Sequence, residues 1–147
     1  MKIQFKKNKK SLSPSYTVMN SFFSLNEKML KKILKNKIKN NNISRLCLHS
    51  HKKEKLHFMI ILQNKGYSHP FKKHPYKDKY YILLSGKQNI RIIDNKKKTK
   101  NISLSSHNFI CKIPKNVIHS NMTKSKDSIH IEIIGGPFNK LKDTIYL

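Results

Sequence analysis

The chain has 147 residues, 37% of them hydrophobic, and a formal net charge of +25 at pH 7. This length is enough to bury one core, and no stretch approaches the roughly 18 apolar residues of a membrane-spanning helix. Only Arg45 and Arg91 of the 32 basic residues are arginine, the residue that reads guanine edges and clamps phosphates, so the composition favours a solvated basic surface over a specific nucleic-acid partner.

Residues 1–23 form a basic N-terminal extension, rich first in lysine and then in Ser, Pro and Tyr, with a short edge strand expected around Tyr16 to Val18. The extension lacks the continuous apolar run of a signal peptide. Cys47 and Cys111 lie far apart without CxxC spacing, which predicts two buried free thiols in a reducing compartment. We therefore expect the protein in the cytoplasm.

Residues 24–42 are predicted to form a helix. Ser24 and Glu27 have the S-x-x-E spacing of a capping box, in which each side chain satisfies a backbone N–H group of the first turn. Apolar residues then recur at helical spacing; they are Leu25, Met29, Leu30, Ile33, Leu34 and Ile38. The run NKIKNNN ends the pattern. We expect this helix to pack on the domain and to carry no chemistry.

From residue 43 to residue 140 the pattern changes to strands. Six segments are short and rich in β-branched and aromatic residues; they are 56–63, 79–85, 89–94, 100–105, 108–114 and 128–134. SGKQ (85–88) and DNKKK (94–98) are typical of hairpin turns. Short, evenly spaced strands predict a mainly β, antiparallel sandwich or barrel, with residues 141–147 as a C-terminal tail.

The order of landmarks in this region narrows the fold to one kind of barrel. Residues 66–86 have the frame of the first cupin motif, G-x5-H-x-H-x(3,4)-E-x6-G, from Gly66 to Gly86. PKNVIHSNMT (114–123) follows the second motif, P-x-G-x-x-H-x3-N, and keeps Pro114 and His119. Residues 25–140 resemble the WbuC-type cupin-fold metalloproteins, which are bacterial proteins often associated with O-antigen and other surface-polysaccharide biosynthesis.

The resemblance implies a cupin double-stranded β-helix, a small antiparallel jelly roll with an N-terminal helix packed against it. In the family pattern, alternate residues on barrel strands point inward. An H-x-H pair, a later Glu and a His from a facing strand therefore converge on a divalent transition metal such as zinc, iron, nickel or manganese. Cupins also commonly pair, so the resemblance further implies a homodimer.

This chain departs from the metal pattern at two of four positions. Lys72 stands at the first histidine position and Lys79 at the glutamate position, and an ammonium group has no lone pair and repels a metal cation. The resemblance thus implies a weakened or lost metal site on His74 and His119, with His69 as a replacement third ligand. Asp78 is one residue from the carboxylate position, so we expect it to point outward.

The role of Lys72 and Lys79 has two interpretations. If both point inward, the barrel mouth is a cationic pocket that favours a carboxylate, a phosphate or a sugar nucleotide. Tyr81 would then contact the ligand, and Arg45 would bind an anion or form a salt bridge with Glu54 or Glu132. If both lysines instead extend to solvent, the pocket is inert.

The sequence predicts a WbuC-like protein of surface-polysaccharide sugar metabolism, binding a small anionic or sugar ligand around His74 and His119. One alternative is a sugar-nucleotide isomerase or epimerase, since a more distant resemblance to metal-independent cupins implies His74 or His119 as base and Tyr67 or Tyr81 as phenolic partner. The other is a non-catalytic module that uses its basic surface. His130, which alternates with apolar residues, is expected to be a packed histidine, and Glu132 either faces solvent or is paired inside.

Overall fold

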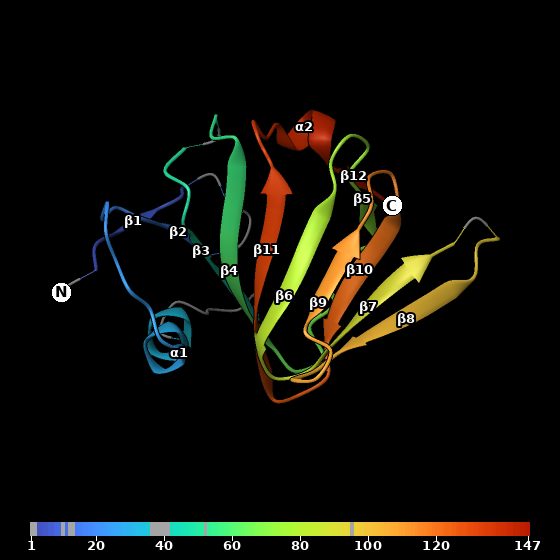
Figure 1. Cartoon of the computed structure of the whole chain (residues 1–147), viewed down its shortest axis with the longest axis horizontal. Helices are drawn as coiled ribbons and strands as arrows, with labels where there is room; N and C mark the ends of the chain where they lie inside the picture. The colour runs from blue at the N-terminus through green and yellow to red at the C-terminus, as the bar shows by residue number, and fades with distance from the viewer. Residues whose placement is uncertain (1–2, 10, 12–13, 36–41, 52, 95) are drawn as a thin grey trace.

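The computed structural model describes residues 3–9, 11, 14–35, 42–51, 53–94 and 96–147. Two sheets face each other and enclose the interior of a barrel (Figure 1). The larger sheet has seven strands, in the order β1 (Phe5–Lys7), β2 (Ser15–Val18), β3 (Ile43–Cys47), β4 (Leu56–Asn64), β11 (Asp127–Gly135), β6 (Lys79–Ser85) and β9 (Ile110–Ile113). The smaller sheet has five, in the order β12 (Ile145–Tyr146), β5 (Lys72–Lys73), β10 (Ile118–Thr123), β7 (Gln88–Ile93) and β8 (Thr99–Leu104).

The expected mainly β barrel with an N-terminal helix is confirmed. All named strand pairs are antiparallel except β2 with β3, which run parallel. The predicted edge strand around Tyr16 to Val18 exists as β2, but it lies between β1 and β3 and is not an edge. The strands of residues 1–23 therefore extend the larger sheet.

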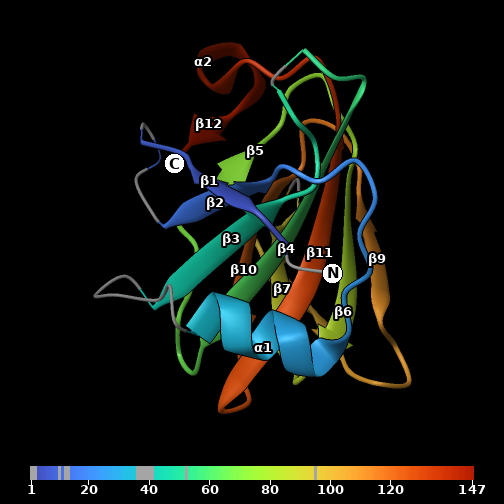
Figure 2. The same cartoon turned by 90° about the vertical axis from the view of Figure 1, so that its left-hand side faces the viewer.

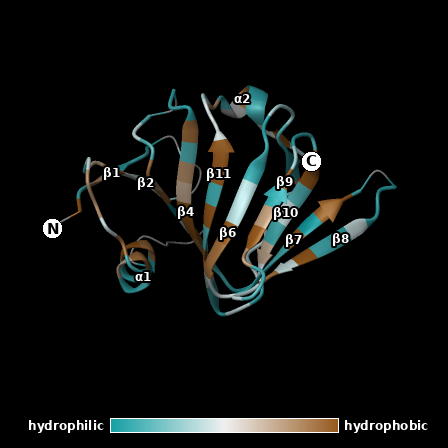
Figure 3. Cartoon of the chain, viewed as in Figure 1, coloured by the Kyte–Doolittle hydropathy of each residue, from teal (hydrophilic) through white to brown (hydrophobic). Residues whose placement is uncertain are grey.

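The barrel strands alternate between apolar and polar residues, and this alternation separates their two faces. On β11, Ile129 and Ile131 face outward, whereas His130 and Glu132 face the interior, where Glu132 is paired with Tyr81 of β6. Figure 3 shows the resulting bands of hydrophobic and hydrophilic residues along β11. The larger sheet is therefore polar on its inner face and apolar on the part of its outer face that belongs to the Leu30–Leu34 cluster, whereas outward residues of β6 and β9 such as Tyr80 and Ile110 are exposed.

Helix α1 (Glu27–Lys35) covers part of the outer face of the larger sheet (Figure 2). Leu30 and Leu34 are its buried residues. They belong to an apolar cluster with Val18, Leu46, Ile60, Leu62 and Ile129. No described helix is long and apolar enough to cross a membrane. The cluster of Leu30 and Leu34 with the sheet confirms the predicted packing of the helix on the domain. Residues 36–41, which include Ile38, lie outside the described residues, and Asn42, the last residue of the predicted helix, is not helical.

The capping prediction for this helix is wrong. Asn26, not Ser24, precedes the first turn, and its side-chain oxygen accepts a hydrogen bond of 2.9 Å from the backbone N–H of Met29. Glu27 is the first helical residue and pairs with Lys31 at 2.6 Å. Asparagine is as good an N-cap as serine. Asn26 therefore caps the helix, which begins two residues later than the Ser24 cap would place it.

One of the two predicted hairpin turns is also wrong. Residues 85–88 do not close a hairpin, because β6 and β7 belong to different sheets and the chain crosses between them there. Gly86 has a φ of +86° at this crossing, and a Cβ would lie 2.3 Å from the carbonyl oxygen of Asp127, so only glycine fits. The other turn, at residues 94–98, does join an antiparallel pair, β7 and β8, with Asn95 outside the described residues.

Candidate functional site

Four strands bring the predicted site residues into the barrel interior. Lys72 on β5 lies opposite His119 on β10, and both are buried. Lys79 and Tyr81 are buried on β6, where Tyr81 lies opposite Glu132 of β11. Because β5 and β10 belong to one sheet and β6 and β11 to the other, the group is assembled from both halves of the chain. The interpretation in which both lysines extend to solvent is therefore wrong.

Lys79 and Glu132 form a buried ion pair at the centre of this group. The Lys79 Nζ and Glu132 Oε2 atoms lie 2.8 Å apart, and the two side chains are 3% and 5% exposed. Burial opposes ionisation of the carboxyl group, but the Lys79 ammonium and His130 hold the pKa of Glu132 well below its usual range. Of the two outcomes expected for Glu132, pairing inside the barrel is the one observed.

His74 and His119 lie next to each other, with ring centroids 5.5 Å apart. The Nδ1 of His119 lies 2.9 Å from the carbonyl oxygen of Val117, and the Nδ1 of His74 lies 2.7 Å from that of Asp143. A carbonyl oxygen only accepts, so Nδ1 carries the proton in both rings. The Nε2 atoms are therefore lone-pair acceptors, and neither has a hydrogen-bond partner among the described residues.

The two imidazoles are held in the neutral form. Burial, together with a smaller effect of the nearby Lys79 ammonium, lowers the pKa of His74 to about 4 and that of His119 to about 3. Near neutral pH each ring therefore offers an uncharged nitrogen that can accept a hydrogen bond. These are the properties of a neutral ligand-binding group, whereas a general base works best with a pKa near the operating pH.

Lys72 is the second amine of the interior and has no carboxylate of its own. It is 7% exposed, and none of the ion pairs among the described residues includes it. Burial and, to a smaller extent, the charge of the Lys79 ammonium together lower the pKa of Lys72 to about 7. Near neutral pH a substantial fraction of this amine is therefore uncharged.

The remaining predicted site residues surround this group at different depths. Tyr81 is fully buried, its ring edge-on to His119, and burial beside Glu132 raises its pKa well above the usual range. Tyr67 is half-buried and packs edge-on against His69, which is buried with an unpartnered Nε2 atom. Arg45 is half-buried on β3, and its charge lowers the pKa of Lys72 and His69.

A polar network next to the ion pair fixes His130. The Gln88 Nε2 amide lies 2.8 Å from His130 Nδ1 and 2.9 Å from Gln63 Oε1. Because the amide nitrogen donates, Nδ1 accepts and the ring proton sits on Nε2, which points at Glu132 over 3.5 Å. The sequence prediction of a packed histidine missed this contact. The alternation of the segment SIHIEII (128–134) could have indicated the contact, because it places His130 and Glu132 on the same face of the strand.

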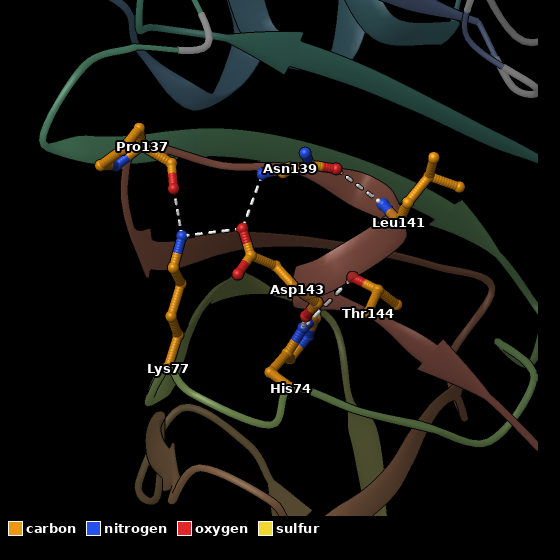
Figure 4. Close-up of polar contacts among 7 residues, drawn as sticks. All are labelled: His74, Lys77, Pro137, Asn139, Leu141, Asp143 and Thr144. Carbon is orange, nitrogen blue, oxygen red and sulfur yellow. Dashed lines mark hydrogen bonds and ion pairs between the residues drawn. The ribbon is translucent and has the colours of Figure 1, made fainter.

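The C-terminal segment closes the barrel end beside His74 (Figure 4). The Asp143 carboxylate, in helix α2 (Lys140–Asp143), pairs with Lys77 at 2.9 Å and accepts the backbone N–H of Asn139 at 2.6 Å. Further along, β12 pairs with β5, and the Thr144 hydroxyl lies 3.3 Å from His74 Nδ1. No sequence pattern indicated these contacts, because they join segments about 70 residues apart.

The exterior of the barrel holds the residues that sequence analysis placed there. Asp78 points outward and pairs with Lys112 at 2.7 Å, as expected from its register. A shallow groove of about 490 Å³ lies on this side, lined among others by Tyr76, Asp78 and Tyr80. None of the predicted interior site residues lines it. The groove is therefore separate from the interior group.

The interior does not fit a tightly held divalent metal. No cluster of three or more His, Cys, Asp or Glu side chains able to hold one occurs among the described residues. Glu132 is engaged by Lys79, and although His69, His74 and His119 each keep an Nε2 atom without a hydrogen-bond partner, they do not come together as a metal-binding group among the described residues. His74 and His119, beside two amines and without a free carboxylate, fall short of a three- or four-ligand transition-metal site.

Comparisons with known proteins agree on the fold. No protein-family model and no curated protein matches the sequence. Among solved structures, the capsular polysaccharide assembling protein CapF from Staphylococcus aureus matches with a TM-score of 0.65 at 17% identity, over 75% of this chain and 33% of that chain. KdgF from Halomonas sp. matches with a TM-score of 0.55 at 15% identity, over 67% and 81% of the two chains.

Oxalate oxidase in complex with the substrate analogue glycolate gives a TM-score of 0.61 at 11% identity, over 74% of this chain and 57% of the enzyme. These neighbours are cupin-superfamily proteins, and the fold of this chain is the cupin double-stranded β-helix. At these identities the likeness concerns the fold alone, and the chain spans about a third of the CapF chain.

Proposed function

We propose that this chain is a WbuC-like cytoplasmic cupin of surface-polysaccharide sugar metabolism that binds a small anionic or sugar ligand inside the barrel. One observation carries the proposal: among the described residues, the interior group has two amines but one carboxylate. Glu132 offsets the charge of Lys79, so protonated Lys72 adds a positive charge that an anionic ligand would neutralise. Arg45 adds to this bias from β3.

The hydrogen-bonding groups of the interior suit the same ligands. The Nε2 atoms of His74 and His119 accept, and the buried hydroxyl of Tyr81 has no hydrogen-bond partner among the described residues. Sites for small polar molecules combine a few such convergent polar groups with an enclosing wall. The structural neighbours support this direction, since one is named for capsular polysaccharide assembly and another holds glycolate, a small carboxylate.

A sugar-nucleotide isomerase or epimerase is the second candidate, favoured by the pairing of Tyr81 with His119. Their ring centroids lie 6.2 Å apart. Burial raises the pKa of Tyr81 well above the usual range and so keeps the phenol protonated. The pKa of His119 is lowered to about 3, mainly by burial, so this imidazole is neutral. A reaction that moves a proton between two carbons of a sugar needs a proton donor and a proton acceptor side by side, and the Tyr81 phenol and the His119 imidazole are such a pair. His74, next to His119, is the other candidate base, and Tyr67, which packs against His69, is the other candidate phenolic donor.

Thermal-shift titration tests the binding proposal. Oxalate, a hexuronic acid, a sugar phosphate and a nucleotide sugar are compared on the wild type, Lys72→Met and Lys73→Met. Lys73 is the matched control, since it follows Lys72 on β5 and its side chain points the other way. We expect at least one of these compounds to stabilise the wild type and Lys73→Met but not Lys72→Met. No stabilisation by any of the four, or equal stabilisation of all three proteins, would contradict the proposal.

A further inference from the structure

The interior group is closed off from solvent at the end of the barrel where His74 lies. Lys72, His74 and His119 are all buried. The element that covers this end is the C-terminal strap, residues 139–147, which comprises α2 and β12 and lies next to β5 (Figure 2). A molecule from solvent can therefore reach these side chains only if part of the covering structure moves.

The strap has a short backbone connection to the barrel. β12 pairs with β5 over two residues and lies at the edge of the smaller sheet. Beyond this pair, the backbone N–H of Leu147 donates to the carbonyl oxygen of Phe71 at 3.0 Å. The wall strands β4 and β11, in contrast, pair over nine residues. A two-residue pair at a sheet edge opens at a much lower free-energy cost than such a ladder.

The strap also buries little apolar surface. Its large apolar side chains Leu141, Ile145, Tyr146 and Leu147 are exposed. Neither apolar cluster of the described residues includes a residue of the strap. Segments with few buried apolar contacts open locally without unfolding of the whole domain. Phe138, immediately before the strap, packs on the barrel instead, because its ring centroid lies 5.6 Å from that of His57.

Polar contacts hold the strap in the closed position (Figure 4). The Lys77 Nζ atom pairs with the Asp143 carboxylate at 2.9 Å and donates to the carbonyl oxygen of Pro137. The His74 Nδ1–H donates to the carbonyl oxygen of Asp143 at 2.7 Å. The Asp143 carboxylate also accepts the backbone N–H of Asn139 at 2.6 Å, which ties α2 into one unit. Lifting the strap therefore releases His74 and uncovers the interior in one movement.

We propose that the C-terminal strap is a gate that controls access to the barrel interior. It moves about Phe138, separates Lys77 from the Asp143 carboxylate, and breaks the hydrogen bond between His74 and Asp143. In the open form the interior is accessible from this end of the barrel, and in the closed form a bound ligand is shielded from water. The inference rests on the proposed function, because it concerns how the same interior site is regulated.

Diethyl pyrocarbonate labelling tests the inference, because this reagent acylates the imidazole nitrogens that it can reach from solvent. The Nε2 atoms of His74 and His119 have no hydrogen-bond partner among the described residues, so burial is what protects them from the reagent. Peptide mass spectrometry locates the labelled histidines and gives a rate for each. His107, exposed on a loop, reports the reactivity of the reagent itself.

A disulfide between β5 and β12 should lock the gate. Lys73 and Ile145 are partners in this antiparallel pair, and the Cα atoms of such partners lie about 4.5 to 5.5 Å apart, a span that a disulfide bridges. In Lys73→Cys/Ile145→Cys we expect His119 to be labelled at least about tenfold more slowly in the oxidised than in the reduced protein, with His107 unchanged. Equal rates at His119, or no labelling of His119 in the reduced protein, overturn the inference.

Urea separates local opening from global unfolding in the wild type, with no substitution needed. Lifting the strap exposes little surface, so the labelling rate of His119 should change little at low urea concentration and rise steeply only as the domain unfolds. A rate that rises from the lowest urea concentration with the slope of global unfolding overturns the inference.

Lys77→Met removes the ion pair that holds the gate closed and should raise the labelling rate of His119 by about threefold or more. Lys112→Met is the matched control, because Lys112 pairs with Asp78 at 2.7 Å outside the strap, and it should keep the wild-type rate. Equal rates in the two variants overturn the inference.

The two proposals fail differently. If the disulfide controls the labelling of His119 but none of the four compounds of the thermal-shift panel stabilises the protein, the binding proposal is overturned and the gate stands. If one of these compounds stabilises the protein but the disulfide does not change the labelling, the gate alone is overturned.

Discussion

The two faces of the seven-stranded sheet are built by the same strands but have opposite chemistry. The outer face holds the cluster of Leu30, Leu34 and Leu46 with its apolar neighbours, where each buried carbon contributes favourably to folding. The inner face holds Lys79 and Glu132, whose charges must be offset after removal from water. The apolar cluster of the outer face therefore stabilises the fold, whereas the buried charges of the inner face cost free energy of folding, as the polar groups of binding sites commonly do.

Breaking the interior ion pair should have the largest effect. Glu132→Gln leaves the Lys79 charge buried without its partner, so we expect a loss of about 3 to 5 kcal/mol in the free energy of unfolding, measured by urea denaturation. The exposed pair of Glu27 with Lys31 gives the control, and Glu27→Gln should cost about 0.5 kcal/mol or less. Equal effects of the two substitutions would mean that the interior pair is not desolvated.

A cavity in the outer cluster should come next. Leu34 is fully buried between α1 and the sheet, so Leu34→Ala should cost about 3 kcal/mol from lost burial and the cavity left behind. Leu141 is 90% exposed, and Leu141→Ala should change the same denaturation midpoint little. Ligand binding by folded Leu34→Ala should be unchanged, since the substitution lies on the other side of the sheet. If the fully folded Leu34→Ala variant lost ligand binding, the two faces of the sheet would not have separate roles.

Removing the interior amine should change how stability depends on alkaline pH. Folding lowers the pKa of Lys72 to about 7, so between pH 7 and 9 the unfolded chain binds a proton that the folded chain does not. Stability therefore rises with pH in this window, by about 2 kcal/mol from this group. Lys72→Met should remove that increment and be the more stable protein at pH 7, whereas Lys73→Met should keep the wild-type slope. Parallel curves for the wild type and Lys72→Met would contradict the shift.

The buried imidazoles should act on the acid side, with an effect of similar size for His119. The pKa of His119 in the folded protein is lowered to about 3, so below about pH 6.5 the unfolded chain binds a proton on this residue that the folded chain does not bind. Stability is thus lost as pH falls from 6.5 to 4.5, by about 2 kcal/mol. His119→Gln should flatten this part of the curve. His107, exposed on a loop, provides the control, since His107→Gln should leave the curve unchanged.

Periodicity in the sequence was enough to predict an antiparallel sandwich or barrel, because strand burial follows an alternation that can be read from the residues themselves, and the motif resemblance narrowed this to the cupin fold. The strand at 79–85 has the same bounds in the structure, whereas the sequence allowed Lys72 and Lys79 to point either inward or to solvent. The cap of α1 was missed because Ser24 and Asn26 both satisfy capping chemistry, and only the folded chain decides between them.

The site was predictable in its position but not in its pairing. The motif spacing placed Lys72, His74, Lys79 and His119 together, and all four are buried in the interior. The partner of Lys79 depended on a strand some fifty residues later, and spacing within a motif carries no information about which charges meet across a barrel. The hydrogen bond from His74 to Asp143 was unpredictable for the same reason.

Isothermal titration calorimetry with oxalate, repeated in two buffers of different ionisation enthalpy, tests the central claim most directly. If the anion binds next to Lys72, it raises the pKa of this amine, and the complex takes up a fraction of a proton near pH 7.5. The measured heat should then differ between buffers for the wild type and Lys73→Met, and not for Lys72→Met. Binding without proton uptake, or no binding at all, would contradict an interior anion site built on Lys72.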